Sequence, residues 1–306
     1  MPALIIERLS KSYDAGKVAL DTLSLTIKRG SFFALLGPNG AGKSTLINIL
    51  ADTVRPSSGR ITLLGEDLFS QRIRCKKRMG VVPQEAAFDP FFTPREILAI
   101  TSGLFGRKPD QSWINTLLDR LELLPHAGKN TRQLSGGMRR RLLVAQALVH
   151  KPELVILDEP TAGVDVELRR RLWDFMRELN AEGTTILLTT HYLEEAEALC
   201  DGVAIIDHGK LLTAQSMKSL MTDGAGSTLW LEFPQPLQEI GAENAQLLAD
   251  FTPTIDAGKL RLRLCQNRAN FHQAYQAAVA RFGAPVDAGV EHEDLEDVFL
   301  RLTGNA

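Results

Sequence analysis

The chain has 306 residues, a formal net charge of −2 at pH 7, 44% hydrophobic residues and 24% charged residues. This balance excludes a strongly basic nucleic-acid-binding chain and a disordered one, and no apolar run is long enough to span a bilayer. The three cysteines are too few and too scattered for a disulfide framework, and their number is typical of a reducing cytosol. The start of the sequence lacks the features of a secretion signal, so we expect a chain that reaches a membrane only through a partner.

The first chemical motif follows a predicted strand over residues 31–37 and precedes a predicted helix over about 43–52. It reads GPNGAGKS and matches G-x-x-x-x-G-K-[S/T] in the strand–loop–helix context that this motif requires. Successive backbone N–H groups of such a loop form an anion nest. We expect Lys43 to reach the β- and γ-phosphates of a nucleotide and the hydroxyl of Ser44 to bind Mg²⁺. A chance glycine-rich turn is the weaker alternative. The expected nucleotide-binding residues are Gly37, Pro38, Asn39, Gly40, Ala41, Gly42, Lys43, Ser44 and Thr45.

Between about residues 90 and 150 the strand pattern disappears. The segment TPREILAITSGLFG begins with Thr93, Pro94 and Glu96, which together are typical of a capping box at a helix start. A second segment, DQSWINTLLDRLELL, has an apolar stripe of its own. We therefore expect an all-helical lobe inserted into an α/β domain.

The stretch QLSGGMRRRLLVAQALVH closes this lobe. It places Ser135, Gly136 and Gly137 immediately before an apolar run with helical spacing. Free backbone N–H groups and the positive end of a helix dipole then coincide, which makes a second anion site. The sequence thus raises the question of why one chain has two phosphate-binding features.

Two further strands end in residues that suit phosphate chemistry. The run 153–159 is a buried strand that places Asp158 where Mg²⁺ would bind and Glu159 where it could polarise an attacking water. A strand-end pair that only meets solvent is the alternative, which the phosphate loop makes weaker. The run 184–190 is followed by His191, again at the carboxyl end where ligands bind in such sheets. A structural histidine is an equally good reading of that position.

Tyr13 and Gln84 have no role that follows from the residues alone. Gln84 follows a short apolar strand and a proline, where a polar loop residue is common. Tyr13 suits core packing or an aromatic face for a base.

Strand-like and helical segments alternate over most of the chain, which predicts a mostly parallel α/β sheet. The composition shifts at the linker-like DGAGS, residues 223–227. We expect a nucleotide-binding domain over residues 1–222 and a small α+β accessory unit over 223–306, of split-βαβ type. A helix around 237–249 and a terminal amphipathic helix belong to that unit.

These motifs, in this order and spacing, resemble the ATP-binding cassette (ABC) family over about residues 3–220. The residues that carry the resemblance are Tyr13, GPNGAGKST, Gln84, LSGGM, LVILDEP, AGVD ending in Asp165, and His191. The resemblance implies a P-loop ATPase fold with ATP and Mg²⁺ as ligands. It implies that Tyr13 stacks on adenine and that Gln84 contacts Mg²⁺ or the water while facing a membrane partner. It further implies that Asp165 works across a subunit interface and that His191 contacts the γ-phosphate.

The same resemblance answers the question of the second anion site. In this family two subunits meet head to tail, and each LSGG helix covers the γ-phosphate held by the other subunit. The partner would be another copy or a paralogue. The tail EDLEDVFLRLTG is similar to that of ATP-binding subunits of bacterial exporters, whose permease is a separate chain that moves drugs, antibiotics, polysaccharides or lipids. We therefore expect a peripheral location at the cytoplasmic face of the inner membrane.

Two other classes of function stay open as weaker alternatives. A soluble ABC protein acting on ribosomes or nucleic acid usually has two cassettes or a long coiled coil, and this sequence has neither. A P-loop kinase would leave LSGGM and His191 without a function. The basic runs 72–78, 139–141 and 169–171 are interpreted as solvated helix faces, so no nucleic-acid partner is expected.

Overall fold

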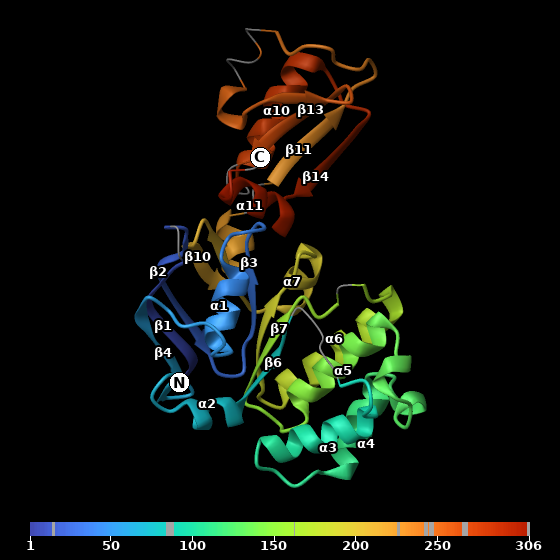
Figure 1. Ribbon diagram of the computed structural model, residues 1–306. Coiled ribbons are helices and arrows are strands. Elements are labelled where there is room, and N and C mark those ends of the chain that lie inside the picture. The colour runs from blue at the N-terminus through green and yellow to red at the C-terminus, as the bar shows by residue number, and fades with distance from the viewer. Residues whose placement is uncertain are drawn as a thin grey trace. The chain divides into compact units, whose positions relative to one another are not determined.

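The computed structural model describes residues 1–306 except 14–15, 84–88, 162, 225–226, 242–243, 245–247, 265–268 and 305–306. The chain divides into two compact units, Met1–Met217 and Lys218–Ala306 (Figure 1). This division falls a few residues before the boundary at residue 222 that the sequence suggests.

A six-stranded, mostly parallel sheet lies at the centre of the described part of the first unit, in the order β10-β9-β3-β8-β7-β6. Neighbouring strands are parallel except for the β9–β10 pair. Strands β3, β7 and β8 are buried along their whole length, which explains their nearly continuous apolar sequences. The strands are β3 (Phe32–Leu36), β6 (Met79–Val82), β7 (Leu154–Asp158), β8 (Thr185–Thr189), β9 (Gly202–Asp207) and β10 (Lys210–Ser216).

A second, antiparallel sheet has the order β2-β1-β4-β5 in the described residues. Buried and exposed residues largely alternate along β2, as expected for a sheet with one face on the core. Leucine and isoleucine side chains from β1, β2 and β4 pack with those of helix α1 in one hydrophobic cluster. The elements are β1 (Pro2–Ser12), β2 (Val18–Lys28), α1 (Lys43–Leu50), β4 (Ser58–Leu63), β5 (Glu66–Asp67) and α2 (Arg72–Arg78).

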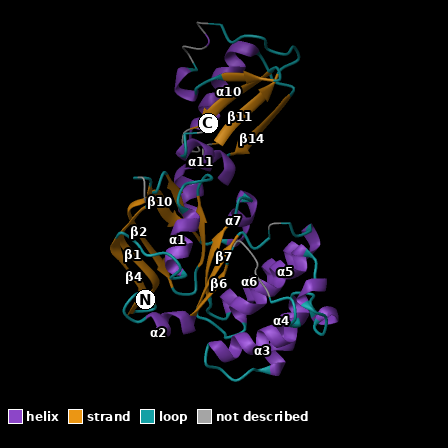
Figure 2. Cartoon of the chain, viewed as in Figure 1, coloured by secondary structure: helices purple, strands orange, loops and turns teal. Residues whose placement is uncertain are grey.

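The predicted helical region contains helices and no strand among its described residues (Figure 2). Thr93 Oγ1 accepts a hydrogen bond from the Glu96 backbone N–H, and the Glu96 carboxylate accepts one of 2.9 Å from the Thr93 backbone N–H, so the capping box is confirmed. The helices are α3 (Pro94–Leu104), α4 (Gln111–Arg120), the short turns η1 (Leu124–His126) and η2 (Thr131–Gln133), and α5 (Gly136–Leu148). Helices α6 (Val166–Ala181) and α7 (Leu193–Leu199) follow β7 and β8 respectively.

The basic runs are not all solvated helix faces. That interpretation is wrong for Arg140 and Arg141 on α5, each of which is only 8% exposed. On α2, Arg72 donates two hydrogen bonds of 2.8 Å to Asp52, and Lys76 Nζ lies 3.0 Å from the same carboxylate. These cations serve contacts within the chain because a carboxylate or carbonyl group lies within their reach.

The second unit is built on an antiparallel sheet with the order β12-β13-β11-β14 in its described part. Strand β11 lies between β13 and β14 and is antiparallel to both, so those two strands are parallel to each other and α10 connects them. This is the split-βαβ arrangement that the sequence suggests. The elements are η3 (Leu220–Gly224), β11 (Ser227–Glu232), η4 (Ala249–Phe251), β12 (Thr254–Asp256), β13 (Lys259–Leu264), α10 (Ala269–Phe282), β14 (Asp287–His292) and α11 (Leu295–Leu302); α8 (Met217–Ser219) lies at the boundary.

The helix expected around 237–249 is only partly testable. Residues 237–241 are not helical, so the prediction is wrong there. Most of the following residues up to 247 lie outside the described part of the chain. The predicted terminal helix is α11, and Asp294 and Asp297 form a capping box at its start.

Candidate nucleotide-binding site

The phosphate loop leaves β3 and enters α1 through backbone that has no room for side chains. Gly42 is the N-cap of α1 with φ 109°, and a Cβ there would lie 2.5 Å from the Ala19 carbonyl oxygen. A Cβ on Gly37 would lie 2.3 Å from the Ile206 carbonyl oxygen. These positions require glycine because the loop passes against the neighbouring strands.

Lys43 bridges the loop from inside. Its ammonium group donates hydrogen bonds to the carbonyl oxygens of Gly37 and Pro38, the latter at 3.0 Å. Burial lowers the pKa of Lys43, while the nearby carboxylates of Glu159 and Asp158 raise it. The positive charge is therefore held between the loop and the acidic end of β7.

Asp158 ends β7 beside the last residue of β8. Its side chain is buried, and burial raises the pKa of this carboxyl group. The Thr189 hydroxyl donates a hydrogen bond of 2.5 Å to Asp158 Oδ1, which acts in the opposite direction by favouring the charged form. The sequence analysis did not select Thr189. Its indicator is a polar residue at the end of an apolar strand, in register with Asp158.

Glu159 and His191 meet just beyond these strand ends. His191 Nδ1 lies 3.6 Å from Glu159 Oε2. The His191 ring also packs on that of Tyr192, with ring centroids 4.0 Å apart. The geometry thus brings together two residues that are 32 positions apart in the sequence.

One cavity of about 260 Å³ is lined by six of the nine predicted phosphate-loop residues, together with Tyr13, Asp158 and Glu159. Lys11 Nζ lies 4.9 Å from the centroid of the Tyr13 ring, and Tyr13 is 41% exposed. The lining residues are Tyr13, Lys17, Val18, Ala19, Asn39, Gly40, Gly42, Lys43, Ser44, Thr45, Asp158 and Glu159. The segment from Lys17 to Ala19 was missed, because nothing in its sequence distinguishes it from an ordinary strand start.

Among the described residues, the other predicted site residues do not line this cavity. Ser135 caps α5 by accepting a hydrogen bond of 3.2 Å from the Met138 N–H, and both Ser135 and Gly136 are exposed. Asp165 caps α6 by accepting a hydrogen bond of 3.0 Å from the Leu168 N–H. Gln84 lies outside the described residues.

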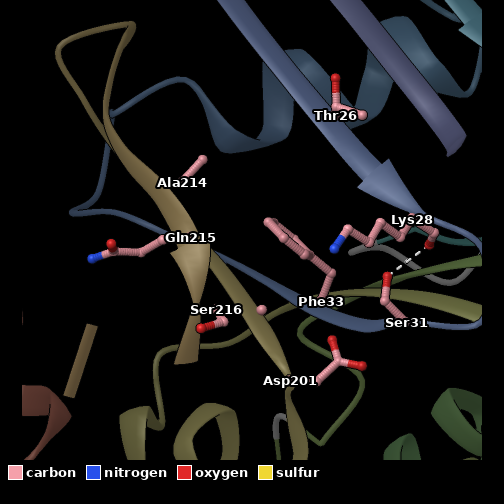
Figure 3. Close-up of a pocket in the computed structure, with 9 residues that line it drawn as sticks. Thr26, Lys28, Ser31, Phe33, Asp201, Ala214, Gln215 and Ser216 are labelled. Atoms are coloured by element: carbon pink, nitrogen blue, oxygen red, sulfur yellow. Dashed lines mark hydrogen bonds between the residues drawn. The ribbon is translucent and has the colours of Figure 1, made fainter. Parts of the chain in front are cut away.

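A second cavity of about 430 Å³ lies at the other end of β3 (Figure 3). Phe33, Lys28 and Asp201 are among its lining residues, and no residue predicted for the nucleotide site is. The chemistry is therefore located by the motifs and not by cavity size.

Ser44 and Asp158 supply a hydroxyl and a carboxylate oxygen to the first cavity, which is the kind of ligand that Mg²⁺ prefers. The described residues contain no group of three or more His, Cys, Asp or Glu side chains that could hold a metal ion alone. Magnesium usually binds through one or two protein oxygens plus substrate phosphates, so these residues fit it.

A phosphate loop after a buried parallel strand, an acidic end on a neighbouring strand and an inserted helical lobe define a nucleotide-hydrolysing ATPase cassette. Comparison with known proteins gives the family: residues 20–162 match the model of the ABC transporter family. The chain belongs to the ABC transporter family, as an ATP-binding and ATP-hydrolysing subunit of the exporter class.

Two similar proteins illustrate this class. The chain is 38% identical to the Nod factor export ATP-binding protein I of Sinorhizobium fredii, over 99% of this chain and 86% of that protein. It is 36% identical to the daunorubicin resistance ATP-binding protein DrrA3 of Streptomyces coeruleorubidus, over 99% of this chain and 96% of that protein.

Solved structures agree on the fold. A structure of the ATP-binding subunit of an ABC transporter superposes with a TM-score of 0.67 at 28% identity, over 71% of this chain and 91% of that one. A dimeric ATP-binding cassette bound to ADP and Pi gives a TM-score of 0.65 at 24% identity, over 70% of this chain and 98% of that one. Among the described residues, no helix has the length and apolar character needed to cross a membrane.

Proposed function

We propose that two copies of this chain close around two Mg·ATP and thereby drive a separate transmembrane permease that exports its substrate. One observation carries this proposal. The cavity that holds the phosphate loop contains no residue of the Ser135–Gly137 segment, whose exposed start of α5 is a second anion site. The free N–H donors at a helix start bind a phosphate best where no other group contacts it. In the proposed dimer, the phosphate is held by the facing copy.

Each site residue has a proposed role that its position supports. The Tyr13 ring stacks on adenine, and Lys43 exchanges its bonds to the loop carbonyls for bonds to the β- and γ-phosphates. Ser44 and Asp158 hold Mg²⁺, which supplies charge neutralisation of the phosphates. Glu159 accepts a proton from the attacking water.

The remaining roles extend toward the partners. His191, beside Glu159, contacts the γ-phosphate. Ser135 and the two glycines after it cover that phosphate from the facing copy. Asp165 lies at the interface between the two copies and also caps its own helix, α6. Gln84 is proposed to contact Mg²⁺ or the water and to face the permease.

The cargo is proposed only as a class. The two relatives named above serve Nod factor export and daunorubicin resistance. By similarity, we propose a drug, lipid or polysaccharide as the substrate, and a peripheral location on the cytoplasmic face of the inner membrane through the permease.

A mixing experiment tests the two-chain site. Lys43→Ala disables the phosphate loop of one protomer, and Ser135→Arg disables the α5 start of another. Each variant alone should lack ATPase activity. A mixture forms heterodimers in which one composite site has neither substitution, so activity should return. If the mixture stays as inactive as its components, the two-copy arrangement is wrong.

The matched control places both substitutions in one chain and mixes it with the wild type. Every composite site of that heterodimer contains one substitution, so activity should fall below that of the wild-type protein at the same concentration. Co-purification of a membrane protein with the wild-type chain tests the permease part of the proposal.

A further inference from the structure

Arg140 joins the ends of two neighbouring strands beside the nucleotide site. It lies on α5, which packs against β6 and β7 (Figure 1). One of its terminal nitrogens, Nη1, donates a hydrogen bond of 2.5 Å to the Pro83 carbonyl oxygen, immediately after β6. The other, Nη2, donates to the carbonyl oxygens of Asp158 and Glu159, the latter at 2.8 Å. A single guanidinium group therefore holds three backbone carbonyls.

The backbone that it holds is strained. Glu159 has φ 47°, in the left-handed region that non-glycine residues rarely adopt. Such conformations persist where the surroundings fix them, and they concentrate at functional sites. Here the surroundings act on both sides. The Glu159 N–H donates to the backbone oxygen of Thr189 at 3.1 Å and to its hydroxyl at 3.2 Å, and Arg140 binds the carbonyl side.

The direction of the Glu159 side chain depends on this backbone. A change in φ or in the orientation of the flanking peptide groups rotates the Cα–Cβ bond and moves the carboxylate away from His191. With both peptide groups held, the carboxylate stays 3.6 Å from His191 Nδ1. The two hydrogen-bonding partners are therefore well placed to orient the proposed base.

Charge and shape favour arginine at this position. Burial lowers the pKa of Arg140, while the carboxylates of Asp158 and Glu159 raise it, so the buried cation is compensated by the two acidic residues of the site. The planar fork of a guanidinium can reach carbonyls on two strands at once, whereas a lysine ammonium is a point donor on a flexible stem.

We propose that Arg140 is a positioning residue for ATP hydrolysis, which locks the left-handed backbone of Glu159 and so aims its carboxylate at the attacking water. The inference rests on the proposed role of Glu159. Because Ser135 caps the helix that carries Arg140, a displacement of the Ser135–Gly137 segment would also reach Glu159 of the same chain.

The test measures kcat and KM for ATP in the full-length Arg140→Lys variant. We expect kcat to fall about tenfold or more, as displacement of a catalytic group by a fraction of an ångström does, with KM within about twofold of the wild type. Arg141→Lys is the matched control. Arg141 is equally buried, but its Nη1 donates to the Leu121 carbonyl at 2.7 Å, inside the helical lobe. The Arg141→Lys substitution should lower the melting temperature and leave kcat unchanged. If the Arg140→Lys variant does not fold, the same measurement is made on Arg140→Gln, which also lacks the planar guanidinium group.

A double-mutant cycle separates this inference from the proposed function. If Arg140 acts through Glu159, adding Arg140→Lys to Glu159→Gln should not slow the residual hydrolysis further. Equal slowing in both backgrounds, or an Arg140→Lys enzyme with wild-type kcat, overturns the positioning role. A Glu159→Gln enzyme with wild-type turnover overturns the proposed function instead.

Discussion

The Thr189 hydroxyl donates a hydrogen bond of 2.5 Å to the carboxylate of Asp158, between the last residues of two neighbouring parallel strands. Both side chains are buried. The hydrogen bond favours the ionised carboxylate, whereas burial favours the protonated form. Thr189 thus favours the charged form of this buried acid, which its proposed role in binding Mg²⁺ requires.

Thr189→Val should shift the acid side of the ATPase pH profile upward. The substitution removes, at nearly constant volume, the hydrogen bond to Asp158 and the 3.2 Å hydrogen bond from the Glu159 N–H, which keeps its 3.1 Å bond to the Thr189 backbone oxygen. Loss of the first bond raises further the pKa of Asp158, which burial already raises. A larger fraction of the carboxyl is then protonated at a given pH, and activity is lost at a higher pH than in the wild type. The measurement is kcat/KM for ATP from pH 5 to 8.

The control for this prediction lies on the same strand. Thr185 is buried at the opposite end of β8, where its hydroxyl accepts a hydrogen bond of 3.0 Å from the Gly30 N–H. Thr185→Val should cost stability without moving the acid limb. If the acid side of the Thr189→Val pH profile coincides with that of the wild type, the hydrogen bond from Thr189 does not control the pKa of Asp158.

Glu159→Gln should separate nucleotide binding from hydrolysis. The amide keeps the size of the side chain but cannot accept the proton of the attacking water, so turnover should fall by about 10²-fold or more while the Kd for ATP changes little. ATP-bound dimers should accumulate on size exclusion. Glu167→Gln is the control, because its carboxylate is 78% exposed and pairs only with Arg171 among its described contacts. Unchanged turnover in the Glu159 variant would remove that residue from the mechanism.

The phosphate loop and the strand ends could be predicted because their chemistry is local. The motif from Gly37 to Ser44 has fixed spacing, and β3, β7 and β8 have short apolar runs that only a terminal Asp or Thr interrupts. Each strand and the residue after it are therefore evident from the sequence alone. The Thr93 capping box is local in the same sense.

The contacts of Arg140 could not be predicted in this way. In the sequence it is the middle of three consecutive arginines, a pattern that usually marks a solvated helix face. Its burial depends on how α5 packs against β6 and β7, which brings carbonyl oxygens from positions 83, 158 and 159 to one guanidinium. Neither periodicity nor spacing contains that long-range information. The same holds for Thr189, whose partner lies 31 residues away.

Tyr13→Ala should weaken ATP binding by about fivefold or more, because stacking of a base on an aromatic ring contributes about 1–3 kcal/mol. Lys11 lies over the ring, so the substitution also removes that cation–π contact. Tyr13→Trp keeps an aromatic face and should keep most of the affinity. Isothermal titration calorimetry measures the Kd for ATP of both variants, with Lys43 unchanged in each. An alanine variant with wild-type affinity would place adenine elsewhere.

His150→Gln should flatten the pH dependence of the stability of the first unit. His150 is completely buried, with Nε2 3.1 Å from the Met79 carbonyl oxygen and its ring stacked 3.7 Å from that of Phe105. Burial lowers its pKa below the ordinary 6.5, the Met79 carbonyl acts in the opposite direction, and Arg107 lowers the pKa further. The unfolded chain therefore binds the proton first, so stability falls as the pH drops below about 6.5, by at most ~1.4 kcal/mol per pH unit. Glutamine does not titrate and lacks this contribution.

Urea unfolding between pH 7.5 and 5.5 measures how steeply the free energy of unfolding changes with pH. The control is His208→Gln, at a histidine whose side chain is 94% exposed, which should keep the wild-type slope. Identical slopes for the His150 variant and the wild type would contradict the assignment.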